Sequence, residues 1–252
     1  MNEIQDSPTK IRESVNVAEE LISQSVLIRG DVGSGSIIEA TTLQVDGSTQ
    51  KDSTQFARYG IINIHKGSLR CHKAKIAVLD GGEVHATKVN IQTCKGGSVY
   101  AQDIEIKEVT NNLMVYASNS ISIDIVTGKD SQFKINYKDI PILNSKLELI
   151  REDLENLNYE LKDATKHNVS QVAELNLKIT TLEDEKSSIL NSYKSAKISI
   201  QKPFNASNAI IFTINDETEI TFKTKMEKYA PFFLEINHNK ITLIPTNQTI
   251  TL

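Results

Sequence analysis

The chain has 252 residues, of which 39% are hydrophobic and 24% charged, so it can bury a sizeable core in one or two domains. Acidic and basic residues are interspersed and the formal net charge is −4, which does not favour a nucleic-acid or anionic-lipid partner. The sequence has no apolar run of the ~20 residues that span a bilayer and no secretory signal at its N-terminus, so we expect a cytoplasmic protein.

Residues 1–24 are polar and mixed in character. They predict at most a short helix or a flexible leader. Together with the following stretch VLIRGDV, this leader is expected to cover one end of the domain that comes next.

Residues 25–140 contain a repeat of about 15 residues, most clearly in GGEVHATKVNI and GGSVYAQDIEI. Each unit has an apolar residue, a spacer, a small Ala or Cys, and then a pair of apolar residues that flank a second spacer. Six units follow this pattern, although Gln55 takes an apolar position in the second: Ile38/Ala40/Leu43/Val45, Gln55/Ala57/Ile62/Ile64, Leu69/Cys71/Ile76/Val78, Val84/Ala86/Val89/Ile91, Val99/Ala101/Ile104/Ile106 and Val115/Ala117/Ile121/Ile123.

The repeat predicts a parallel β-solenoid. Its length is too short for a helical repeat, and the alternation within each unit has the period of two that is typical of strands. Matching strands of successive coils would pair, so that the apolar positions form columns inside. Gly67, Gly81, Gly82, Gly96 and Gly97 would provide the bends.

Two columns of residues are expected to face outward. One is polar and comprises Gln44, Asn63, Ala77, Asn90, Glu105 and Ser122. The other is aromatic and basic, and comprises Glu39, Phe56, Arg70, His85, Tyr100 and Tyr116. Phe56, Arg70, His85, Tyr100 and Tyr116 are candidate partner-binding residues, and the alternative is ordinary cross-strand packing on a half-exposed sheet.

Residues 141–197 change to a heptad pattern that predicts an antiparallel coiled-coil hairpin. Its turn is expected near Lys166 to Ser170, since the two registers do not join there; one continuous helix is the alternative, because this stretch has neither Gly nor Pro. The first seam comprises Leu143, Leu147, Ile150, Leu154, Leu157, Leu161 and Ala164, and the second comprises Val172, Leu175, Ile179, Leu182, Lys186, Ile189, Tyr193 and Ala196.

Residues 198–252 return to alternation. The stretches IIFTI, EITF, FFLEI and KITLI predict strands that extend or cap the solenoid, with a tight turn at Asn237, His238 and Asn239. The predicted fold is therefore mainly β with inserted α.

This order of modules resembles the flagellar assembly protein A family. The resemblance is carried by VLIRGDVGSGSIIEATTLQVDGST, KGSLRCHKAKIAVLDGGEVHATKVNIQ, GGSVYAQDIEI and AKISIQKPFNASNAIIFTI, over roughly residues 25–215. It implies a right-handed parallel β-helix and a cytoplasmic role in flagellar assembly or polar organisation, without catalysis. Family members commonly have a further N-terminal domain, so the chain is expected to be a short member or a fragment.

No pattern in the sequence predicts an active site. Cys71 and Cys94 have neither CxxC nor Cys/His spacing, and the five histidines have no spacing typical of metal ligands. The chain has no Trp to form a sugar platform, and the carboxylates Asp80, Glu83, Asp103 and Glu108 are dispersed at expected turns. We therefore expect no catalytic residues, no cofactor and no metal.

The sequence favours a non-catalytic scaffold that binds protein partners, through the hairpin or by self-association, and neither binds nucleic acid nor inserts in a membrane. A polymerising element like the bactofilins is the main alternative. A carbohydrate-active β-helix enzyme is a weaker one, since such an enzyme needs positioned acid and base groups.

Overall fold

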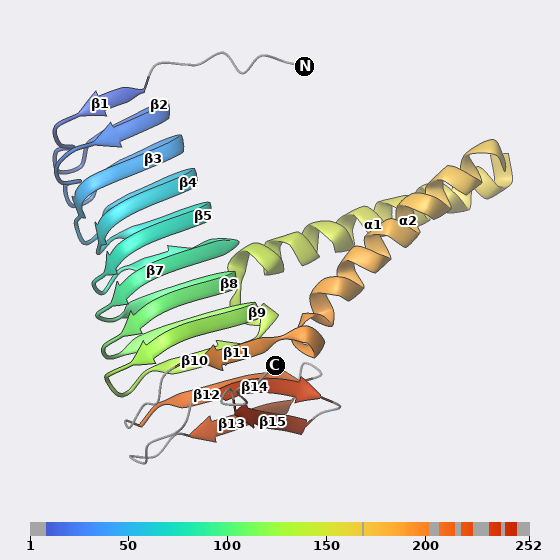
Figure 1. Ribbon diagram of the computed structural model, residues 1–252. Coiled ribbons are helices and arrows are strands. Elements are labelled where there is room, and N and C mark those ends of the chain that lie inside the picture. Colours follow the sequence, from blue (N-terminus) through green and yellow to red (C-terminus); the bar gives the residue numbers. More distant parts are fainter. Residues whose placement is uncertain are drawn as a thin grey trace, which may run out of the picture.

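The computed structural model describes residues 9–167, 169–201, 207–214, 218–223, 232–237 and 240–245. Its strands form one mainly parallel sheet that winds into a β-solenoid of about eight turns, and two helices project from the side of this solenoid (Figure 1). The predicted β-solenoid is confirmed.

The first ten strands make up the parallel stack, and one helical segment separates them from the strands that follow. The stack comprises β1 (Lys10–Arg12), β2 (Glu20–Ile28), β3 (Ile37–Thr49), β4 (Thr54–His65), β5 (Ser68–Leu79), β6 (Glu83–His85), β7 (Lys88–Cys94), β8 (Gly97–Val109), β9 (Leu113–Val126) and β10 (Gln132–Ile135). The rest comprises η1 (Tyr137–Asp139), α1 (Pro141–His167), α2 (Val169–Leu190), η2 (Ser192–Ser195), β11 (Lys197–Ile200), β12 (Ala209–Ile214), β13 (Thr218–Lys223), β14 (Phe232–Asn237) and β15 (Lys240–Pro245).

The small residues of the repeat lie in one inward column. Ala40 is in register with Ala57 and Ala57 with Cys71, and Ala101 is in register with Ala117. From Cys71 onward the column is buried. A small side chain suits this position because the coil turns its corner here and leaves little room inside.

The predicted alignment of the second and third units is wrong by two residues. Ile62 and Ile76 belong to the column of Val45 and not to that of Leu43. In the column of Leu43 the next two residues are Gly60 and Ala74. A glycine suggests a turn in the sequence, yet Gly60 lies within β4, and the side chain of Leu69 packs next to it. The polar outward column therefore contains Ile61 and Lys75 in place of Asn63 and Ala77.

The solenoid also begins earlier than predicted. Part of the expected leader forms β1, which pairs with Val26–Ile28, and β2 starts at Glu20. Val15 and Leu21 are buried in the core, although residues 1–24 as a whole are polar and mixed in character. The stretch VLIRGDV consequently lies between two coils and does not cover an end.

The helices are inserted at one corner of one coil. β10 pairs in parallel with the first half of β9, and β11 pairs in parallel with the second half. Residues 136–196 are therefore inserted between the two paired segments of this coil. In earlier coils a single residue, such as Arg58 or His72, connects the same two segments. The register of the stack continues across the insertion.

The two helices, together called the helical arm, pack along each other. Lys146 Nζ near the start of α1 lies 2.5 Å from Glu185 Oε1 near the end of α2, so the helices run in opposite directions and the single continuous helix is excluded. Among the side chains of α1 that the structure describes, only the seam residues are buried or half-buried. The predicted turn includes Asn168, which lies outside the described residues.

Antiparallel pairs follow the parallel stack. β12 pairs with β13, and β14 pairs with both β11 and β15 in antiparallel fashion. The turn predicted at residues 237–239 falls on His238 and Asn239, which are outside the described residues.

One inward column contains a buried polar pair. His65 Nδ1 lies 2.8 Å from the hydroxyl of Thr49, and its Nε2 lies 3.1 Å from the carbonyl oxygen of Glu83. Because that carbonyl can only accept, Nε2 carries the proton and Nδ1 accepts from Thr49. Burial lowers the pKa of His65 from 6.5 to about 4, so the ring is neutral near pH 7.

We expect His65 to make the fold sensitive to acid. The pKa of His65 is lower in the folded chain than in the unfolded chain, so stability is lost as the pH falls from 6.5 towards 4, by up to about 3 kcal/mol. Urea unfolding across this range should show a weaker pH dependence for His65→Gln than for the parent chain. The exposed His72→Gln is the control, and an equal dependence in all three proteins would contradict the assignment.

Candidate functional site

The predicted aromatic and basic column exists in the structure. Backbone register places Glu39, Phe56, Arg70, His85, Tyr100 and Tyr116 at equivalent positions of successive coils, so all five candidate residues come together. Ile22 precedes Glu39 in the column, and Lys134 follows Tyr116. We call these eight residues the outward ladder. The spacing of the repeat could have identified Ile22, which is one coil before Glu39.

Three rings of the ladder stack face to face. The ring centroids of His85 and Tyr100 are 4.6 Å apart and those of Tyr100 and Tyr116 are 4.7 Å apart, with interplanar angles of 5° and 3°. These distances match the separation of neighbouring strands, so the in-register backbone sets the stack. His85 also contacts the carboxylate of Glu83, and burial raises the pKa of Tyr100.

The base of the helical arm covers the last part of this stack. Tyr137, Ile140 and Leu143 form a small buried cluster that packs against Tyr100 and Tyr116. The same cluster contacts Leu147, Ile189 and Leu190, so both helices are held at this point. Tyr100 and Tyr116 therefore help to fix the arm to the solenoid. Both rings remain half-buried, because the arm covers only part of them.

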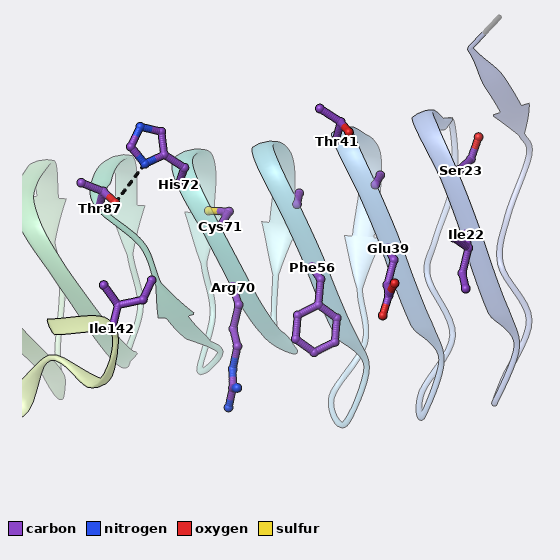
Figure 2. A pocket seen from close by; sticks show the side chains of 12 residues that line it. Ile22, Ser23, Glu39, Thr41, Phe56, Arg70, Cys71, His72, Thr87 and Ile142 are labelled. Carbon is purple, nitrogen blue, oxygen red and sulfur yellow. Dashed lines mark hydrogen bonds between the residues drawn. The ribbon is translucent and has the colours of Figure 1, made fainter. Parts of the chain in front are cut away.

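The first part of the ladder borders an open groove of about 600 Å³ (Figure 2). Glu39, Phe56 and Arg70 point to the same side from neighbouring strands, and Ile142 of α1 closes one end. Ile22 is 61% exposed and Ile142 is 44% exposed. This part of the ladder offers an apolar and charged surface to a partner.

The thiol that borders the groove belongs to Cys71 and is buried. Burial raises the pKa of Cys71 to about 12, and it also raises the pKa of Cys94, which lies in the core. Both side chains therefore stay protonated near neutral pH and pack as small apolar groups.

The helical arm carries a second groove, of about 580 Å³, between α1 and α2. Leu157 and Leu182 line it together with the charged residues Asp153, Glu160 and Lys178. Large apolar side chains are also exposed along the arm: Leu149 by 61%, Tyr159 by 77% and Leu177 by 69%. The arm thus has more apolar surface than the packing of its two helices covers.

The dispersed carboxylates take part in local contacts at different coils. Asp80 lies 3.6 Å from Lys66, and Asp103 accepts hydrogen bonds from Asn119 and Ser120. The described part of the chain contains no group of three or more His, Cys, Asp or Glu side chains that could hold a metal ion. None of its helices is long and apolar enough to cross a membrane.

Comparisons with family models, curated proteins and solved structures give no match to this chain. The resemblance to the flagellar assembly protein A family therefore depends on the order of the modules and on the stretches quoted above.

We expect the part of the ladder under the arm to contribute more to stability than the part beside the open groove. Tyr116→Ala removes a ring that both stacks on Tyr100 and supports the arm, and should lower the free energy of unfolding by roughly 2 to 4 kcal/mol. Phe56→Ala, at the half-buried equivalent position of the open groove, should cost about 1 kcal/mol or less. Denaturant unfolding measures both, and equal losses would contradict this division.

Proposed function

We propose that the protein is a non-catalytic scaffold in which the solenoid is a rigid mount and the helical arm, an antiparallel coiled-coil hairpin, is the docking element for protein partners. The observation that carries this proposal is the insertion of the arm at a single corner between β10 and β11. A long excursion that leaves the surrounding register unchanged adds little to the fold, and so is best explained by an interaction.

The packing of the arm supports a docking role. Its heptad residues are buried or half-buried where described, and Leu143 at its base joins the small cluster on the ladder. Two helices bury only part of such a seam, and helices of this kind gain most of their stability from packing. Exposed Leu149, Tyr159 and Leu177 therefore suit a further protein surface.

The pairing of the C-terminal strands favours a protein that does not polymerise end to end into a filament. The pairs β12–β13 and β14–β15 are antiparallel, whereas the stack before them is parallel. We infer that they cap this end of the solenoid, because a change of strand direction interrupts the pattern that end-to-end stacking would continue. Polymerisation like that of the bactofilins is thus the less favoured alternative.

The cellular process we propose is flagellar assembly or its polar organisation, in the cytoplasm. This proposal is supported by the order of solenoid, helices and further strands in the sequence, which resembles that of the flagellar assembly protein A family. A carbohydrate-active enzyme is not favoured, because Asp80, Glu83 and Asp103 belong to separate local contacts and do not converge on one groove.

Replacement of residues 143–195 by a short Gly/Ser linker tests the proposal. The ends of the arm lie at one corner, so the variant should keep the β circular dichroism of the parent while losing the partners that the parent captures from its own cells. In those cells it should also fail to support normal flagella by staining. A variant that unfolds, or one that folds and keeps every partner, would contradict the proposed roles.

A further inference from the structure

We propose that the open part of the outward ladder binds helix α1 of a second copy of this chain. The receiving residues are Glu39, Phe56 and Arg70, and the inserted residues are Glu155, Tyr159 and Lys162. This inference rests on the proposed role of the arm as a docking element and names its partner.

The receiving surface presents two opposite charges on either side of an aromatic ring. Glu39, Phe56 and Arg70 occupy three successive coils, so Glu39 and Arg70 are about 10 Å apart along the stack at the usual spacing of strands. Their side chains point to the same side in Figure 2. Among the described residues, neither Glu39 nor Arg70 has an ion-pair partner.

Helix α1 carries a matching row on its exposed side. Glu155, Tyr159 and Lys162 are separated by four and three residues, so they lie on one face of the helix. At a rise of 1.5 Å per residue, Glu155 and Lys162 are also about 10 Å apart. All three side chains are exposed, whereas Leu154, Leu157 and Leu161 on the seam are half-buried.

The two rows are complementary in one orientation only. With Tyr159 on Phe56, Glu155 lies at Arg70 and Lys162 lies at Glu39, which makes two opposite-charge pairs around an aromatic pair. The reversed helix would place like charges together, which is unfavourable. The carboxylate of Glu155 can form an ion pair with Arg70 of the second copy. Its contact with Arg151 is long, at 3.9 Å, and its side chain is 74% exposed.

The helix must come from another molecule. Leu143 is buried in the cluster that holds the arm to Tyr100 and Tyr116, so α1 starts at a fixed point. From there α1 runs away from the solenoid (Figure 1) and Glu155 lies about 20 Å along it. Its own ladder is therefore out of reach, while the ladder of a second copy is accessible.

Sedimentation velocity of the purified full-length chain over a range of concentrations tests this inference. The parent should self-associate. Arg70→Glu and Glu155→Arg should each raise the dissociation constant by roughly tenfold or more, because each places like charges opposite one another. The double variant R70E/E155R restores an opposite-charge pair and should recover most of the association.

Matched controls are Lys75→Glu on β5 and Glu183→Arg on α2, which change exposed charges outside both rows and should leave the association unchanged. Circular dichroism and melting temperature establish that each variant is folded. The inference is overturned by a parent chain that stays monomeric, by a double variant that does not recover, or by controls that weaken association equally. A monomeric parent would not contradict the scaffold proposal, which the capture experiment decides separately.

Discussion

The parallel hydrogen-bond register between neighbouring coils is the constraint on which the rest of this structure depends. It places equivalent residues of each coil one strand spacing apart, and so converts a loose repeat into continuous columns. Inside, these columns are mainly apolar from Leu21 to Ile210, with buried polar exceptions such as Gln55 and the pair of Thr49 and His65. Outside, the same register stacks His85, Tyr100 and Tyr116 at 4.6 and 4.7 Å. The outward ladder is therefore a direct result of the backbone pairing.

The same constraint explains how the helical arm can be carried without loss of the core. β10 and β11 each keep their partner segment on β9, so the coil is complete although the chain leaves it at the corner. The arm contacts the solenoid at its base, where Tyr137 and Leu143 pack on the stacked tyrosines. One ladder thus has two roles: its last rings hold the arm, and its first residues remain open beside the groove.

The sequence predicted the solenoid because strand alternation and the small Ala or Cys recur together, and it predicted the outward ladder for the same reason. It failed where local residue type conceals a position. Gly60 suggests a turn but lies inside a strand, and of the neighbouring Val15 and Val17 only Val15 is buried. The buried pair of Thr49 and His65 could not be predicted, since only their mutual hydrogen bond makes these polar groups suitable for the core. Likewise, only the packed base of the arm shows which rings of the ladder contact the helices.

Hydrogen exchange followed by mass spectrometry tests most directly whether the solenoid and the arm are a mount and an independent projection. Amides of the strands β3–β9 lie in the continuous stack and should exchange only through global unfolding, whereas the helices of the arm should open with a lower free energy. We expect two separate exchange classes divided near residues 136 and 196. A single class, in which the arm and the strands exchange together at every denaturant concentration, would contradict it.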